Sequence, residues 1–257
     1  MPNIQLKNFN CQYEYLDFGK NQTIVFSNSL GTDFSMWNEV VERIKNDFNI
    51  LLHDTRGHGK STNLQKELSI AELGEDVIEL ISYLQINQDL VFCGLSMGGL
   101  IGQYLGIHHP ERFKKIILAN TAAKIGTDEG WNTRIQQVTE NGLESILDGT
   151  QERWFTPQFR AENQQRIQEI LTKFAANEVS GYCANCAAVR DADFRSQLKK
   201  TTAKTLIIAG KEDLVTTVDD GKFIQNEIPN AEVKVLNAAH LSAVECAEEF
   251  AEVILTF

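Results

Sequence analysis

Residues 90–99 read Leu90-Val91-Phe92-Cys93-Gly94-Leu95-Ser96-Met97-Gly98-Gly99, an apolar run followed by a glycine-rich turn. The run over 90–93 predicts a buried strand, and the residues after Gly99 have the period of a helix. The pattern G-x-S-x-G over 94–98 therefore lies between a strand and a helix. In that setting a tight turn lifts the serine hydroxyl into a cleft, and the helix N-terminus favours developing negative charge. Ser96 is thus the candidate nucleophile, and the alternative is a turn serine that caps the helix.

Short apolar runs alternate with segments of helical period along most of the chain. This alternation is typical of an α/β fold, in which helices cover both faces of a mostly parallel sheet, here of about eight strands. The expected strands are an opening antiparallel pair at residues 4–9 and 11–17 and further strands at 23–26, 50–53, 90–93, 115–119, 205–209 and 232–236. The expected helices are 70–84, a helix from Ser96 to the His109-Pro110 step, one near 220–227 and a closing helix over 243–255.

The helix over 70–84 has a clear start signal. Ser69 is the expected N-cap, and Glu72 follows three residues later. This spacing predicts a capping box, in which the two side chains satisfy each other's backbone N–H groups.

Strand-like runs disappear between residues 122 and 196, where aromatic and arginine side chains occur among helical patterns. We interpret this segment as a helical cap inserted after the sixth strand. The core domain is then built from residues 1–121 and 197–257, on both sides of the cap over 122–196.

Charge and composition exclude several classes of function. The 257 residues include 35 acidic and 24 basic side chains, for a net charge of −11, with no basic run of the kind that nucleic-acid binding requires. The apolar runs are far shorter than the roughly 20 residues that span a bilayer. The N-terminal residues resemble no secretory signal, so the cytoplasm is the expected location. The five cysteines fit reduced thiols better than a disulfide framework.

A serine nucleophile needs a base and a carboxylate that orients the base. Of the five histidines, His240 fits best, because it lies in a loop after the last predicted strand. Asp213 follows the predicted strand over 205–209, where the ends of parallel strands deliver side chains to a site. Glu212 is its nearest competitor. The order Ser96, Asp213, His240 predicts a catalytic triad. The alternative for each of the three is a purely structural role, as a turn, capping or core residue.

A tetrahedral intermediate also needs backbone N–H donors for its oxyanion. Met97 supplies one by position, because it follows the nucleophile. The loop over 26–31 follows a predicted strand, and the Leu30 N–H is the second candidate.

Two further patterns have structural interpretations. Cys183 and Cys186 form a C-x-x-C, but no second pair or nearby histidine completes a zinc site. The turn over 54–61 contains Gly-His-Gly without the spacing of a phosphate-binding loop, and its Arg56 and His58 are expected to order that turn. We therefore expect no metal and no cofactor.

Longer segments carry a family resemblance. Residues 94–99, the turn over 54–61 and the placement of Asp213 and His240 resemble α/β-hydrolases. Within that superfamily the chain is similar to the 3-oxoadipate enol-lactonases of the β-ketoadipate route of aromatic degradation. This closer similarity lies in residues 27–32, 119–126, 130–135, 153–157 and 189–194. Asn28-Ser29 stands where many members of the superfamily have His-Gly, and this departure is itself typical of the enol-lactonases.

The resemblance implies the α/β-hydrolase fold and hydrolysis of 3-oxoadipate enol-lactone, a small molecule with a free carboxylate. Because the whole protein is acidic, a local cation has to bind that carboxylate. Arg134 and Arg190, in the predicted cap, are the candidates, since guanidinium binds carboxylate in a bidentate manner. Each of them can equally join cap helices by a salt bridge. Trp131 and Trp154 are candidates for the pocket wall, with core packing as the alternative.

Two other functions stay open at this point. A broad carboxylesterase, with some perhydrolase activity, would use the same triad. A ligand-binding module without catalysis would keep only the fold. The sequence favours neither a nucleic-acid nor a membrane partner, and the oligomeric state is not readable from it.

Overall fold

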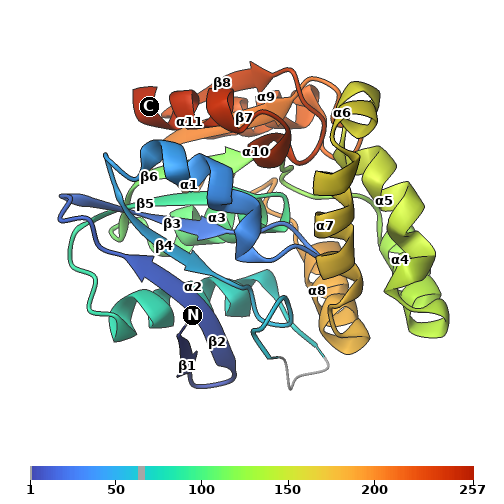
Figure 1. Cartoon of the computed structure of the whole chain (residues 1–257). Coiled ribbons are helices and arrows are strands. Elements are labelled where there is room, and N and C mark those ends of the chain that lie inside the picture. Colours follow the sequence, from blue (N-terminus) through green and yellow to red (C-terminus); the bar gives the residue numbers. More distant parts are fainter. Residues whose placement is uncertain (1, 63–66) are drawn as a thin grey trace.

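The computed structural model describes residues 2–62 and 67–257, in which helices surround a central sheet (Figure 1). Eight strands form this sheet in the order β1-β2-β4-β3-β5-β6-β7-β8. Their bounds are β1 (Asn3–Gln5), β2 (Asn10–Leu16), β3 (Gln22–Ser27), β4 (Asn49–His53), β5 (Asp89–Leu95), β6 (Phe113–Ala119), β7 (Lys204–Gly210) and β8 (Ala231–Leu236).

The sheet is mostly parallel, as the sequence predicts. β2 is antiparallel to both β1 and β4, and every neighbouring pair from β4 to β8 is parallel. The central strands read as continuous apolar runs because helices bury both of their faces. All residues of β4, for example, are buried.

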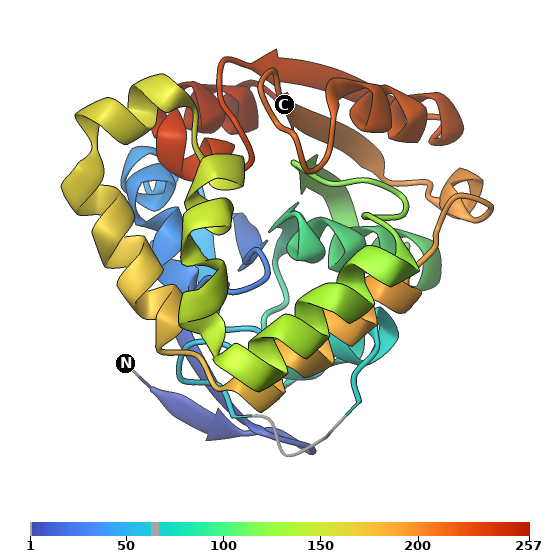
Figure 2. The same ribbon diagram turned by 90° about the vertical axis from the view of Figure 1, so that its right-hand side faces the viewer.

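Helices cover the two faces of the sheet. Their bounds are α1 (Asn38–Ile44), α2 (Ile70–Tyr83), α3 (Met97–His108), α9 (Val218–Glu227), α10 (Ser242–Glu245) and α11 (Ala247–Thr256), with short 3-10 helices η1 (Phe34–Trp37), η2 (Leu143–Ile146) and η3 (Leu198–Lys200). α1 packs against α11, and α2 packs against α3. Seen along the strands, α1 and α11 lie on one face of the sheet and α3 and α9 on the other (Figure 2).

The start of α2 confirms the predicted capping box. The Ser69 hydroxyl accepts the Glu72 N–H, and the Glu72 carboxylate accepts the Ser69 N–H. The apolar stripe of α2, which includes Leu73, Val77 and Leu80, is buried.

Five helices lie between β6 and β7 and cover the carboxyl ends of the parallel strands (Figures 1 and 2). We call them the cap helices: α4 (Asp128–Asn141), α5 (Leu147–Trp154), α6 (Pro157–Glu162), α7 (Gln164–Ala175) and α8 (Val179–Asp191). α4 packs along α8, and α5 packs on α7. The space between the cap helices and the strand ends is where the candidate residues meet.

Two sequence expectations are corrected. The predicted closing helix over 243–255 is broken at Cys246, whose φ of −136° and ψ of 55° lie outside the helical region, so α10 and α11 are separate. The first strand is also shorter than predicted, because the Leu6 N–H donates to the Phe9 carbonyl at 2.9 Å and closes a turn there. Within the described ranges, no helix is long and apolar enough to cross a membrane.

Candidate active site

Ser96 lies in the sharp turn between β5 and α3. Its φ of 58° is in the left-handed region, which costs a non-glycine residue about 1–3 kcal/mol. Two contacts hold the turn: the Ser96 N–H donates to the Ala119 carbonyl at 2.9 Å, and the Thr121 hydroxyl donates to the Ser96 carbonyl at 2.8 Å. The surrounding backbone therefore fixes a strained residue with its hydroxyl at the cavity.

The two glycines of the motif are required by close approach. A Cβ on Gly94 would overlap the Gly98 carbonyl oxygen, and a Cβ on Gly98 would overlap the Ser27 carbonyl oxygen. Backbone obstructs both positions, so no side-chain movement can make room. The turn between β5 and α3 can therefore pack against β3 only if positions 94 and 98 are both glycine.

His240 bridges Ser96 and Asp213. Its Nε2 lies 2.9 Å from the Ser96 Oγ, and its Nδ1 lies 2.9 Å from the Asp213 Oδ2. The three residues follow β5, β7 and β8, so the parallel sheet brings them together from distant parts of the chain. All three are buried. This is the geometry of a nucleophile, a base and a group that orients the base.

Asp213 is held as a carboxylate by its neighbours. Its Oδ1 accepts the N–H groups of Val215 and Thr216 at 2.8 and 3.0 Å, and its Oδ2 accepts the Thr216 hydroxyl at 2.8 Å. Burial alone would raise the pKa of Asp213, but the electrostatic interaction with His240 and hydrogen bonds from His240, Asn120 and the Thr216 N–H lower it to about 2. The competing Glu212 is exposed and lines a different surface.

Asn120 is a residue of this network that the sequence analysis did not single out. Its Nδ2 donates to the Asp213 Oδ2 and to the Ala239 carbonyl, both at 3.0 Å, and its Oδ1 accepts the Ser242 hydroxyl at 2.5 Å. It joins the acid loop to the histidine loop. Its place directly after β6, at the same edge of the sheet, is the signal that could have revealed it.

The other histidines lie elsewhere. Burial lowers the pKa values of His53 and His58 to about 4, and neither residue lines the cavity. His108 and His109 are at the end of α3, where the His109 Nε2 lies 2.7 Å from the Glu75 carboxylate. Of the histidines, all of which belong to the described residues, His240 alone borders the cavity.

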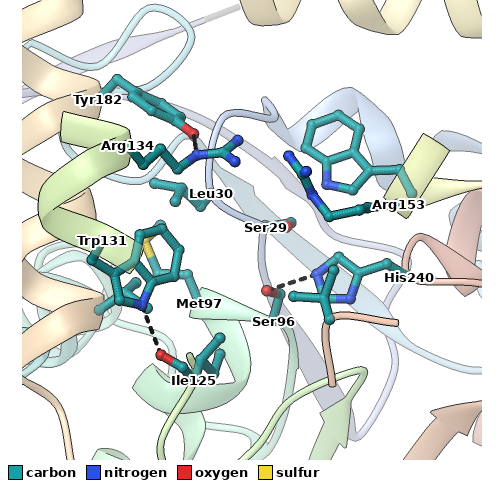
Figure 3. Close-up of a pocket in the computed structure, with 13 residues that line it drawn as sticks. Ser29, Leu30, Ser96, Met97, Ile125, Trp131, Arg134, Arg153, Tyr182 and His240 are labelled. Carbon is teal, nitrogen blue, oxygen red and sulfur yellow. Dashed lines mark hydrogen bonds between the residues drawn. The ribbon is translucent and has the colours of Figure 1, made fainter. Parts of the chain in front are cut away.

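Leu30 and Met97 line the same cavity as Ser96 (Figure 3). Met97 is the first residue of α3, where N–H groups have no partner within the helix. The loop that carries Leu30 is ordered by buried Asn28, whose Oδ1 accepts the Thr55 hydroxyl at 2.8 Å. Asn28 therefore has a specific structural role in the place where the superfamily often has histidine.

The cap helices supply the opposite wall. Trp131, Arg134 and Trp154 all line the cavity, as does Arg153, which the sequence analysis had not proposed as a binding residue. Arg134 donates from Nε to the Tyr182 hydroxyl at 2.6 Å, and the Trp131 indole N–H donates to the Ile125 carbonyl at 2.7 Å (Figure 3). Side chains of α4 and α5 thus face Ser96 across the cavity.

Arg190 is not among the residues that line this cavity. Its guanidinium pairs with Asp191 at 2.7 Å and donates to the Asn132 side chain at 2.7 Å, so it joins α8 to α4. These contacts fit the alternative in which Arg190 joins cap helices by a salt bridge, and substrate binding by Arg190 stays a prediction.

The other patterns of the sequence also lie outside the cavity. Arg56 pairs with buried Asp76 of α2 and stacks over the Phe9 ring, so the turn over 54–61 is tied to the core. Cys183 and Cys186 are free thiols on α8. Cys186 is buried, and burial raises its pKa to about 12.

Comparison with known proteins shows what the chain is similar to. Residues 20–241 match the family model described as serine aminopeptidase, S33. The chain is 43% identical to 3-oxoadipate enol-lactonase 2 of Acinetobacter baylyi, over 92% of this chain and 89% of that protein, and 42% identical to 3-oxoadipate enol-lactonase 1 of the same organism, over 91% and 87%. The crystal structure of the enol-lactonase from Burkholderia xenovorans LB400 superposes with a TM-score of 0.96 at 34% identity, covering 99% of this chain and 98% of that one.

Proposed function

The chain belongs to the family of 3-oxoadipate enol-lactonases, and we propose that it hydrolyses 3-oxoadipate enol-lactone to 3-oxoadipate in the β-ketoadipate route of aromatic degradation. The observation that carries the proposal is the hydrogen-bonded series from Ser96 through His240 to Asp213, placed under a cavity wall that presents arginine. A lactone is an internal ester, so its hydrolysis requires acyl transfer to an activated nucleophile and then to water.

In the first step the Ser96 Oγ attacks the lactone carbonyl carbon while the His240 Nε2 takes the serine proton. Asp213 stabilises the resulting imidazolium. The Leu30 and Met97 N–H groups bind the oxyanion of the tetrahedral intermediate. When the intermediate collapses, the ring C–O bond breaks, and the enol oxygen takes the proton from His240.

The second step releases the product. After ring opening the whole substrate stays bound to Ser96, because the leaving enol is part of the same molecule as the acyl group. Conversion of this enol to a ketone opposes re-closure of the ring. His240 then removes a proton from water, which attacks the acyl carbonyl. The C–O bond to Ser96 breaks, the serine regains its proton, and the diacid departs.

The cap over residues 122–196 selects the substrate in this proposal. Arg134 binds the free carboxylate of the lactone, since it lines the cavity and no acidic side chain of the described chain pairs with it. Trp131 and Trp154 form apolar walls beside it. A local cation is needed because the protein as a whole carries a charge of −11.

The covalent mechanism is tested with Ser96→Ala. Rapid-mixing measurements on wild-type protein are expected to show a burst of ring opening, and the variant is expected to lose the burst and to lose kcat by about 1,000-fold or more. Ser82→Ala, on the exposed side of α2, is the matched control and should behave as wild type. Turnover by Ser96→Ala near the wild-type rate would refute the acyl-enzyme.

A further inference from the structure

Arg153 is a half-buried cation without a partner in the structure. It lies in the last turn of α5 and lines the same cavity as Ser96. Across residues 2–62 and 67–257 its guanidinium makes no hydrogen bond and no ion pair. In Figure 3 the side chains of Arg153 and Arg134 extend toward each other from opposite sides, above Ser29 and Ser96.

The two guanidiniums together make the cavity strongly cationic. None of the described residues that line it is acidic. Burial and the charge of Arg134 both lower the pKa of Arg153, whereas the nearby Glu152 is exposed and only partly compensates. Two like charges that face each other in a half-buried cavity repel, and an anion between them would remove this repulsion.

The two arginines differ in the donors that they have left. Arg134 already uses Nε for the Tyr182 hydroxyl at 2.6 Å and one terminal nitrogen for the Thr150 hydroxyl at 3.3 Å. Arg153 has its whole donor fork free. A carboxylate binds best to two parallel N–H groups of one guanidinium. Arg153 has both edges of its guanidinium available for that contact, whereas Arg134 has lost the edge that includes Nε.

We propose that Arg153 is a second carboxylate-binding residue, which binds the substrate carboxylate through its fork while Arg134 contributes one further N–H from the facing wall. The proposal rests on the proposed function, because it assigns the same carboxylate to a pair of residues. It makes Arg153 a determinant of specificity for acyl groups that end in a carboxylate.

The backbone beside Arg153 fixes this anion site relative to the reacting groups. The carbonyl of the next residue, Trp154, accepts the Leu241 N–H at 3.0 Å, and Leu241 follows His240 directly. This hydrogen bond therefore holds the end of α5, which carries Arg153, against the loop that carries His240. We expect the protein to discriminate among carboxylate-bearing acyl chains by their length.

The test compares two chromogenic esters with acyl chains of six carbons, mono-p-nitrophenyl adipate and neutral p-nitrophenyl hexanoate. Arg153→Gln should lower kcat/KM for the acidic ester by about tenfold or more, through KM, and change the neutral ester by less than about twofold. Arg153→Lys, which keeps the charge but loses the fork, should give an intermediate loss for the acidic ester.

Arg195→Gln is the matched control for the loss of one positive charge, because Arg195 is exposed and lies outside the cavity. It should change both esters by less than about twofold. Equal effects of Arg153→Gln on the two esters, or no effect on either, would overturn the proposal, and a wild-type value for Arg153→Lys would overturn the fork contact. Adipate as a competitive inhibitor of hexanoate ester hydrolysis gives a second readout, and its inhibition constant should rise in Arg153→Gln.

These esters separate the two proposals. If the wild-type protein prefers the acidic ester but does not open 3-oxoadipate enol-lactone, the proposed substrate is wrong and the anion site stands. If it opens the lactone and Arg153→Gln leaves the preference for the acidic ester unchanged, the proposed function stands and the role of Arg153 is wrong.

Discussion

Thr216 contacts Asp213 twice, through its N–H at 3.0 Å and its hydroxyl at 2.8 Å. The hydroxyl binds the same oxygen that accepts from His240. Thr216→Val removes the hydroxyl and keeps the shape and the backbone. We expect kcat to fall about three- to tenfold, because Asp213 is held less firmly against the imidazole.

Thr216→Ser, which restores a hydroxyl, serves as the control and should recover most of the lost activity. Steady-state kinetics with the lactone provide the measurement, and thermal melting shows whether both variants are folded. If the valine and serine variants have the same kcat, Thr216 does not position Asp213.

At the same scale, the sequence indicated some residues of the site and not others. Ser96 has a motif, and Asp213 and His240 follow predicted strands in the order that the motif requires, so their meeting at 2.9 Å could be anticipated. Arg153 has no such signal. Whether a cap arginine faces the cavity depends on the rotation of its helix, which the weak amphipathic pattern of α4, α5 and α8 does not define.

The short helix α10 also connects the cap to the histidine loop, through Glu245. Its carboxylate accepts the Ala239 N–H at 2.9 Å and also the hydroxyl of Thr156, in the segment between α5 and α6. Ala239, directly before His240, and Thr156 of the cap thus both bind the Glu245 carboxylate. Glu245→Gln removes the negative charge and replaces one acceptor oxygen by a donor, so it weakens these charge-assisted contacts.

We expect Glu245→Gln to lower kcat for the lactone about tenfold with little change in KM, because it disturbs His240 without touching the cavity. Glu249→Gln is the control, since Glu249 is exposed, lies nearby and loses the same charge. Thr156→Ser should keep wild-type activity, because it keeps the hydroxyl. A Glu245→Gln effect that matches that of Glu249→Gln would contradict the positioning role.

The elements themselves were largely predictable. The buried strands stand out because apolar runs without alternation are typical of parallel sheets. The break at Cys246 was missed because α10 and α11 share one apolar pattern, which does not reveal the non-helical φ and ψ of Cys246. The limits of 122–196 as a separate cap domain remain a prediction.

At the scale of the whole molecule, buried titratable groups connect stability to pH. Burial lowers the pKa of His58 from 6.5 to about 4. Between these two pH values His58 is protonated in the unfolded chain but not in the folded chain. Its contribution to the free energy of unfolding is therefore lost as pH falls from 6.5 toward 4. Asp54 and Asp76 act in the opposite direction, because burial raises their pKa values to about 6.

A variant isolates the contribution of this histidine. In the difference between wild-type protein and His58→Gln, the contributions of Asp54 and Asp76 cancel. Between pH 7.5 and pH 5 the wild-type protein should lose about 2 kcal/mol of unfolding free energy relative to His58→Gln. Urea unfolding at the two pH values measures it. A difference that is independent of pH would mean that His58 is protonated equally in both states.

The cap lies at the carboxyl ends of the parallel strands, where Ser96 is located. The cavity between them carries two arginines, although the protein as a whole is acidic. The most direct test is therefore a comparison of substrates on the wild-type protein, with kcat/KM measured for 3-oxoadipate enol-lactone and for neutral p-nitrophenyl butyrate. We predict that the lactone is preferred by about 100-fold or more, since the cavity binds its carboxylate. If the neutral ester is the better substrate, the triad can still act as an esterase, but the protein is not an enol-lactonase.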